Sequence, residues 1–231
     1  MIQKLEYLLS LPKSIYVCFR LFQLKDALKL PMLVRYNCRL HSLVGTVDID
    51  ADKIRFGMCK VGFAVVGIFD KTTSPAILKI KGRITLKSTA SFGQGSRICV
   101  GPEGHLTIGK EFLNTAEGAI LCFHRIVLGN KVLVSWNTTI MDTDFHAVRN
   151  LQTGKVTNPI GEVVVGNDVW IGMGSTLLKN TVVPDGCIIG AQTLLNKAFT
   201  EPNTLLAGNP GIVKKRNVCR QKEEWEIAIE N

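Results

Sequence analysis

Branched aliphatic or small residues recur every sixth position through much of this 231-residue chain. In the clearest run, residues 165–195, the units open with Val165, Ile171, Leu177, Val183, Ile189 and Leu195. An earlier run with the same spacing consists of Ala116, Cys122, Leu128, Val134 and Ile140. A helix would repeat its apolar face near 3.6 residues, and an exposed strand near 2. A period of six instead fits a short strand followed by a corner.

Small or β-branched residues follow the openers of the clearest run by four positions. They are Val169, Ser175, Thr181, Cys187 and Thr193. Such residues suit tight corners, where Gly and Asn also tolerate the positive φ of a sharp turn. Three units close a triangular coil of eighteen residues, and coils stack at the parallel-strand spacing of about 4.8 Å. We expect the openers to point inward as continuous aliphatic ladders.

The composition agrees with this architecture. Charged residues make up 20% and hydrophobic residues 46%, which is typical of a folded globular chain. The length is enough for one large domain with a sizeable core. Scarce aromatics, at 7%, and 21 glycines fit many short strands joined by tight corners.

The end of the repeat carries a further signal. The tail Leu206-Ala-Gly-Asn-Pro-Gly-Ile-Val-Lys-Lys-Arg216 is similar to the G-N-P-A-x-x-[IV]-[KR] ending of the hexapeptide-repeat acyltransferase family, with Gly211 in place of the usual alanine. With the six-residue count, the chain resembles that family over residues 79–216. The resemblance implies an all-β fold, a left-handed parallel β-helix. The six-count alone does not give that handedness, which runs against the usual crossover rule.

The segments outside the repeat are less regular. We expect residues 1–78 to form an N-terminal helix and irregular first coils or a small β cap. Residues 14–30 are strongly apolar with basic edges, which indicates a helix. The chain ends with Glu223, Glu224, Trp225, Glu226, Ile227 and Ile229, so a short C-terminal helix is expected within 217–231.

The count breaks between Ile140 and Val165, because their separation is not a multiple of six. A loop must leave the coil there, and its polar composition over residues 146–162 marks it as a loop. Loops that project from a rigid scaffold commonly carry function. Just before it stands Asp142-Thr-Asp-Phe-His146, which is similar to the D-x-D-x-H stretch of family members that act on cell-surface sugars.

The resemblance implies that His146 is the general base that removes a proton from the acceptor hydroxyl. Imidazole suits this role because its unperturbed pKa lies near 6.5. Asp142 or Asp144 would hold the imidazole tautomer, as the third group of a triad does. Turn-forming carboxylates are the alternative for both, and a solvent-facing loop residue is the alternative for His146.

Three further residues are candidate acceptor contacts. Eighteen residues separate His124 from Asp142, so the two should lie one above the other on one face. Trp136 takes the same position within its own six-residue unit, but on a neighbouring side of the triangular coil, and Asn137 follows it. A Trp suits stacking against a sugar, but packing against a neighbouring subunit would also explain it. A plain corner residue is the alternative for His124.

The resemblance implies that acetyl-CoA binds in a groove between two subunits of a homotrimer. Carried over to this chain, the residues along the groove are Trp170, Gly172, Gly174, Gly190 and Ala191, and those facing phosphate are Lys197, Lys214 and Lys215. A backbone N–H from a glycine-bearing corner would stabilise the oxyanion. Corner geometry alone also explains the glycines, and a solvated tail also explains Lys214 and Lys215. No metal is expected.

The positive charge is concentrated near the N-terminus. The formal net charge is +9, and the first forty residues hold seven basic and two acidic side chains. No nucleic-acid-binding signature accompanies them, so we expect no nucleic acid partner. An anionic membrane surface or a phosphate-rich molecule fits the charge at least as well. The apolar N-terminal helix is expected either to pack on the domain or a neighbouring subunit, or to lie on the inner membrane leaflet.

The seven cysteines are widely spaced, their number is odd, and no CxxC occurs. A disulfide framework or a thiolate zinc site is therefore not expected, and reduced thiols favour a cytoplasmic location. No apolar run is long enough for a spanning helix, and no signal peptide is expected.

These patterns predict an acetyl-CoA-dependent O-acetyltransferase that modifies a sugar hydroxyl in surface polysaccharide biosynthesis. Two other classes stay open. The same coil occurs in zinc enzymes similar to γ-class carbonic anhydrases, although the four histidines show no close paired spacing. A non-catalytic scaffold is the other alternative.

Overall fold

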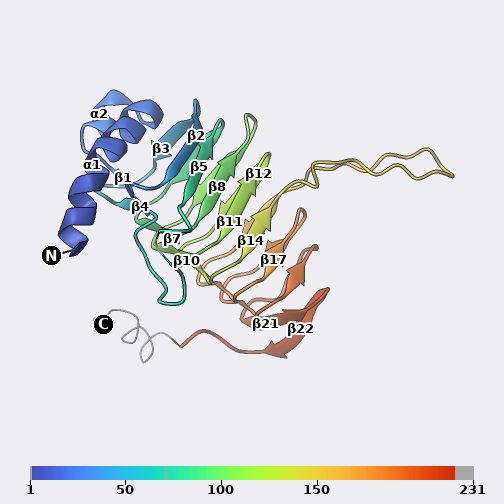
Figure 1. Ribbon diagram of the computed structural model, residues 1–231. Coiled ribbons are helices and arrows are strands. Elements are labelled where there is room, and N and C mark those ends of the chain that lie inside the picture. The colour runs from blue at the N-terminus through green and yellow to red at the C-terminus, as the bar shows by residue number, and fades with distance from the viewer. Residues whose placement is uncertain (1, 71, 222–231) are drawn as a thin grey trace.

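A computed structural model describes residues 2–70 and 72–221, with side chains from residue 5 onward. The chain begins with helices α1 (Ile2–Leu21) and α2 (Leu24–Ala27) and continues as strands in three sheets (Figure 1). Sheet A contains β1 (Met32–Val34), β4 (Cys59–Val61), β7 (Ala90–Gln94), β10 (Phe112–Ala116), β13 (Leu133–Val134), β16 (Trp170–Ile171), β19 (Ile188–Ile189), β21 (Thr204–Gly208) and β22 (Gly211–Arg216).

The other two sheets follow the same order along the prism. Sheet B contains β2 (Arg39–Leu43), β5 (Ile77–Ile80), β8 (Arg97–Val100), β11 (Ala119–Cys122), β14 (Thr139–Met141), β17 (Thr176–Leu177) and β20 (Leu194–Leu195). Sheet C contains β3 (Thr46–Ile49), β6 (Arg83–Leu86), β9 (His105–Ile108), β12 (Arg125–Leu128), β15 (Val163–Val165) and β18 (Val182–Val183).

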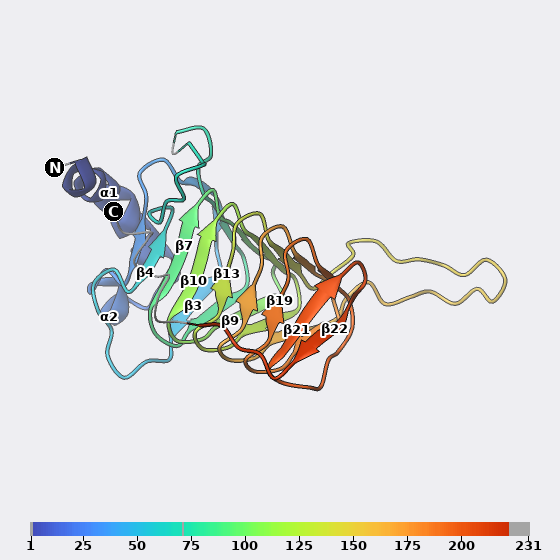
Figure 2. The same ribbon diagram turned by 90° about the horizontal axis from the view of Figure 1, so that it is seen from below.

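Each coil gives one strand to each sheet, and strands of successive coils pair in parallel. The exception is β22, which pairs antiparallel with β21 as a terminal hairpin. Figure 2 shows the coils stacked along one axis with this hairpin at the end. This confirms the predicted left-handed parallel β-helix.

The core is the interior of the triangular prism. All the openers of both six-residue runs are buried, at 2% exposure or less. The corner residues four positions later, such as Val169, Ser175 and Cys187, are buried as well. The aliphatic ladders are therefore continuous, and the hydrophobic effect stabilises every coil against its neighbours.

The coils begin earlier than residue 79, where the resemblance to the hexapeptide-repeat family begins. Met32 of β1 already pairs with Cys59 of β4, and Cys59 pairs with Ala90 of β7. The corners of these first coils are long and unequal, whereas Trp170 pairs with Ile188 at the regular spacing of eighteen. Long corners remove the period from the sequence but leave the strand pairing intact.

The N-terminal segment also differs from the expected helix over residues 14–30. Helix α1 begins at Ile2 and ends at Leu21, because Gln23 has an extended backbone with φ −60° and ψ 146°. The four-residue α2 follows. In the part of the chain that the structure describes, neither helix has the length and apolarity needed to cross a bilayer. At the other end, β22 stops at Arg216, and most of the predicted C-terminal helix lies outside the described residues.

Candidate functional site

Two edges of the prism carry the residues that the sequence singled out. The AB edge, where sheet A turns into sheet B, is formed by residues 135–138, 172–175 and 190–193 in successive coils. The BC edge, where sheet B turns into sheet C, is formed by residues 123–124, 142–162, 178–181 and 196–197. The predicted site residues lie on or beside one of these two edges or on the terminal hairpin.

The break in the count is a hairpin arm, residues 142–162, which leaves the BC edge between β14 and β15 and projects far from the prism (Figures 1 and 2). Antiparallel bridges join Thr143 to Ile160 and Arg149 to Val156. Towards the tip, the Thr157 N–H donates to the Val148 carbonyl at 2.8 Å. The predicted loop 146–162 is thus the outer part of a two-stranded arm.

Asp142 fastens the root of this arm. Its side chain is fully buried, and its two carboxylate oxygens accept the backbone N–H groups of Phe123 and His124, both at 2.8 Å. Its own carbonyl accepts the Gly161 N–H at 3.0 Å. His124 and Asp142 therefore lie one above the other, as their spacing predicts. The carboxylate also helps to raise the pKa of the Cys122 thiol, second to the effect of burial.

Asp144 makes a different contact from the one that a triad needs. Its carboxylate lies 2.9 Å from the ammonium of Lys179, whose Nζ also donates to the Asn158 carbonyl at 2.6 Å. Lys179 is a residue that the sequence analysis missed. A signal was present, because Lys179 follows Leu177 by two positions, as Asp142 follows Ile140. The shared slot places both on the BC edge.

His146 lies on the arm just beyond its root, and its side chain is exposed. The preceding Phe145 has φ +59°, a left-handed conformation that is uncommon for a bulky residue. Its ring packs edge-on against Phe123, with 4.9 Å between ring centroids. This contact holds the chain where His146 leaves the prism. Within the described residues, no hydrogen bond joins the imidazole to Asp142 or Asp144, so the predicted dyad is not formed in the single chain.

The predicted acceptor and donor residues meet on the AB edge. Trp136 is half-buried there, and its carbonyl accepts the Gly174 N–H of the next coil at 3.0 Å. Trp170 lies at the end of β16, and its indole N–H donates to the Ser135 hydroxyl at 3.1 Å. Asn137 is exposed beside them, with φ +58°. Two tryptophans and an amide thus share one edge.

The glycines of this edge have a structural role that the sequence left open. A Cβ on Gly172 would lie 2.7 Å from the backbone nitrogen of Ala191, so the close approach of two coils requires glycine. The N–H groups of Gly172, Gly174 and Gly190 all donate to backbone carbonyls of neighbouring coils. Because these N–H groups are already bonded, an oxyanion would need another donor. The glycines give a ligand only the space that a side chain would otherwise fill.

The three predicted phosphate-binding lysines do not form one cluster. Lys197 is exposed on the BC edge, with its ammonium 5.5 Å from the centre of the Phe199 ring. Lys214 and Lys215 are exposed on β22, at the end of the prism. Within one chain, His146 lies on the BC edge, whereas the predicted groove residues Trp170, Gly172, Gly174, Gly190 and Ala191 lie on or beside the AB edge.

The geometry does not assemble a metal site. Across residues 2–70 and 72–221, no three side chains of the His, Cys, Asp and Glu types come together as ligands. The His105 ring nitrogen instead lies 2.9 Å from the Thr85 hydroxyl, on the outside of sheet C. The four histidines are spread over separate coils.

Comparison with known proteins finds the hexapeptide repeat in the later coils. Residues 162–197 match the model of the bacterial transferase hexapeptide, six repeats. That stretch covers the later coils and both sides of the AB edge, but it does not reach His146. The later coils of the chain therefore carry the hexapeptide repeat of bacterial transferases.

Individual members align over unequal lengths. A probable macrolide acetyltransferase of Lysinibacillus sphaericus is 36% identical over 70 residues, which are 30% of this chain and 38% of that protein. A putative lipopolysaccharide biosynthesis O-acetyl transferase of Escherichia coli, WbbJ, is 24% identical over 67% of this chain and 82% of its own length. The polysialic acid O-acetyltransferase OatWY shares the fold, with a TM-score of 0.50 and 19% identity over 84% of this chain and 88% of its own.

Proposed function

We propose that this hexapeptide-repeat protein transfers an acetyl group from acetyl-CoA to a hydroxyl group of a saccharide. The observation that carries the proposal is the position of His146. An exposed imidazole stands at the root of an arm that is fastened to the prism by Asp142, Asp144 and the Phe145 ring. The anchored root of the arm keeps this imidazole in position when an acceptor binds. General-base catalysis typically contributes about 10²–10⁴-fold to the rate.

In the proposed reaction, His146 takes the proton of the acceptor hydroxyl as that oxygen attacks the thioester carbonyl. A new C–O bond forms and the C–S bond breaks. The leaving thiolate of CoA receives the proton back from the imidazolium. Atoms and charges balance without an added metal or redox partner. His124 lies one coil below on the same edge, where it can contact the acceptor.

We further propose that the active site is shared between subunits of a homotrimer. The base lies on the BC edge, whereas Trp136, Asn137, Trp170 and the glycine corners lie on the AB edge. Two edges of one prism cannot face each other. They can do so when the BC edge and arm of one subunit lie against the AB edge of its partner. The exposed Val148, Leu151 and Val156 on the arm supply apolar surface for such a contact.

The relatives favour a saccharide as the acceptor class. WbbJ aligns over most of its length and is described as acting in lipopolysaccharide biosynthesis. In the trimer we propose, the paired tryptophans of the AB edge would offer flat surfaces on which a sugar ring or the adenine of CoA can stack. Lys197, Lys214 and Lys215 would meet the phosphates of CoA as point charges.

The test is release of free CoA thiol from acetyl-CoA across a panel of saccharides. We expect wild type to release thiol with at least one member of the panel, and His146→Ala to lower kcat by about 10²–10⁴-fold. His41→Ala is the matched control, because His41 is an exposed histidine on the first coil. Equal rates for the two variants and wild type would remove the base assignment. A panel without any thiol release would favour a non-catalytic scaffold.

A further inference from the structure

Helix α1 presents its apolar residues to the outside of the molecule. Leu5, Leu8, Leu9, Ile15, Tyr16 and Phe19 are each between 42% and 62% exposed. Together with the exposed Pro12 they follow the i, i+3, i+4, i+7 spacing of a single helix face. We call this set the outer face of α1. A surface helix normally turns such a face inward.

The inward side of α1 carries two serines beside the apolar Val17, Cys18 and Leu21, and the serines complete the open edge of the first strand. The Ser14 hydroxyl accepts the Val34 N–H at 2.9 Å, and the Ser10 hydroxyl accepts the Tyr36 N–H at 3.0 Å. Both serines are fully buried. Among the described strands, none pairs with this side of β1, so without the helix these backbone groups would lack partners within the protein.

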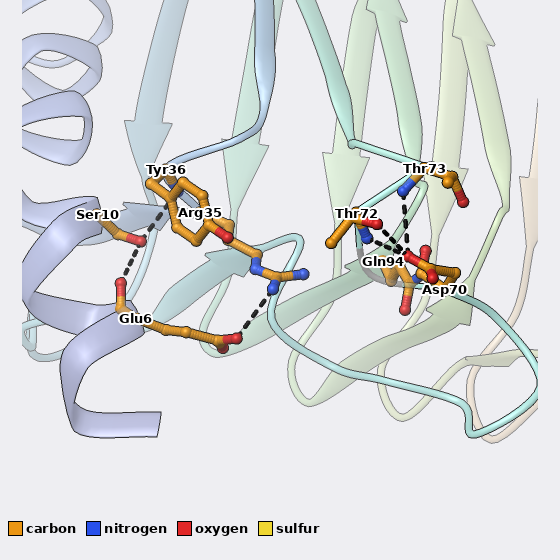
Figure 3. Close-up of polar contacts among 8 residues, drawn as sticks. All are labelled: Glu6, Ser10, Arg35, Tyr36, Asp70, Thr72, Thr73 and Gln94. Carbon is orange, nitrogen blue, oxygen red and sulfur yellow. Dashed lines mark hydrogen bonds and ion pairs between the residues drawn. The ribbon is translucent and has the colours of Figure 1, made fainter. Parts of the chain in front are cut away.

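Charged side chains hold the same arrangement (Figure 3). The Glu6 carboxylate lies 2.9 Å from the buried guanidinium of Arg35. The Lys13 ammonium donates to the carbonyls of Tyr36 and Cys38 just after β1, at 2.7 Å for Cys38. The orientation of α1 is thus fixed by polar contacts with the prism. Its outer face stays uncovered for a physical reason.

Basic residues border the outer face at its C-terminal end. Arg20, Lys25 and Lys29 are exposed, and Leu24 and Leu28 beside them are two-thirds exposed. The two carboxylates of this segment are Glu6, which is paired with Arg35, and Asp26, which is half-buried. The surface is therefore apolar in the middle and positively charged at one end.

We infer that the outer face of α1 docks on a lipid bilayer surface that contains anionic lipid. A helix with this pattern lies in the plane of the interface, with its apolar side chains among the acyl chains and its basic side chains at the headgroups. A second copy of the chain is a poorer occupant, because the two described carboxylates of this segment are paired or half-buried and so offer the basic end little complementary charge. Figure 1 places α1 at the opposite end of the prism from the terminal hairpin, with the arm pointing away from it.

The test is sedimentation of the full chain with vesicles of phosphatidylcholine containing about one third phosphatidylglycerol. We expect wild type to bind these vesicles and to bind more weakly when salt is raised to about 0.5 M. The double variant Leu8→Ser, Phe19→Ser should bind at least about tenfold more weakly. Replacing Arg20, Lys25 and Lys29 by Gln should weaken binding about fivefold per charge, on anionic vesicles alone.

Ile212→Ser is the matched control, since Ile212 is an equally exposed aliphatic residue on the terminal hairpin. It should bind as wild type does, and circular dichroism should show every variant folded. Wild type that fails to bind anionic vesicles would overturn the inference, as would a double variant that binds unchanged. A double variant that alters only the assembly size would assign the face to contact between copies instead. None of these readouts depends on the transferase proposal.

Discussion

One slot of the coil holds side chains with different roles in successive turns of the prism. Two positions after the inward residue of sheet B stand His124, Asp142, Lys179 and Lys197. The backbone places all four on the BC edge, but burial and contacts separate them. Asp142 is buried and bonded to two amides, while Lys179 pairs with Asp144. Residue type and slot together locate a side chain, and its neighbours decide its role.

Asp142→Ala should lower the stability of the fold more than it changes the chemistry. Removing the carboxylate leaves the N–H groups of Phe123 and His124 without acceptors in a buried corner. Because hydrogen bonds to a charged group contribute about 1.5–3 kcal/mol each, we expect a loss of about 3 kcal/mol in the free energy of unfolding. Urea denaturation measures this value.

Asp144→Ala is the matched control, because its ion pair with Lys179 is partly exposed. Pairs of this kind contribute about 1 kcal/mol or less. If Asp142→Ala proved as stable as Asp144→Ala, the anchoring role assigned to Asp142 would be wrong. A loss of activity at unchanged stability would return Asp142 to the role of partner of His146.

At the scale of elements, the arm has little support from the rest of its own chain beyond its root. Its two halves contact each other through bridges and the Val148–Thr157 backbone pair. Asn150 closes the tip by accepting the N–H groups of Gln152 and Thr153. Leu151 is 95% exposed at that tip. An element with so little packing in one subunit is expected to find its partner in another.

Replacing residues 148–157 by a short glycine turn should separate assembly from folding. The root contacts of Asp142 and Asp144 lie outside the deletion, so the free energy of unfolding per chain should change by about 1 kcal/mol or less. The proposed trimer should dissociate at least about tenfold more readily, with a matching loss of thiol release. Sedimentation equilibrium and the thiol assay measure the two effects.

Point variants refine this experiment. Leu151→Ser should weaken assembly, whereas Ile68→Ser, an exposed aliphatic residue in the loop between β4 and β5, should not. A trimmed arm that leaves assembly and transfer unchanged would contradict the shared site.

At the scale of the whole molecule, the prism encloses one continuous hydrophobic core, which α1 closes at one end. Cys18 lies on α1, Cys38 in the first coil and Cys59 on β4 of the second coil, and all three are buried. Burial raises the pKa of the Cys38 and Cys59 thiols to about 12, from an ordinary value of 9.0. For Cys59, the neighbouring Cys18 adds to the effect.

These thiols make the fold sensitive to alkali. Above pH 9 the unfolded chain releases thiol protons that the folded chain keeps until about pH 12, so the unfolded state binds fewer protons. Stability is therefore fully present below pH 9 and falls as pH rises through this window, by about 1.4 kcal/mol per pH unit for each such thiol.

Urea denaturation of wild type and Cys59→Ala at several pH values checks this expectation. The slope of the free energy of unfolding against pH should be shallower in the variant by about 1.4 kcal/mol per unit. Cys219→Ala, which removes an exposed thiol, is the control and should keep the wild-type slope. Equal slopes for Cys59→Ala and wild type would show that the buried thiol ionises in the folded chain.

Sequence reasoning located the candidate site residues but not their grouping. The spacing of His124 and Asp142 was enough to stack them, since that relation depends only on the coil period. The pairing of Asp144 with Lys179 was not foreseen, because the arm between them has no period that relates their positions. The sequence did not show that the site residues divide between two edges of the prism, because that division depends on where each corner lies in space.

The sequence by itself determined the prism, because each six-residue unit packs only on its neighbours and the inward aliphatic residues mark every turn. It also determined that the chain must leave the coil after Ile140. Only the tertiary structure decided that coils start at Met32, that Asp142 faces an amide corner and that α1 turns its serines inward. These features depend on contacts between segments that no repeat relates. The conformation of each such segment is set by the segment against which it packs.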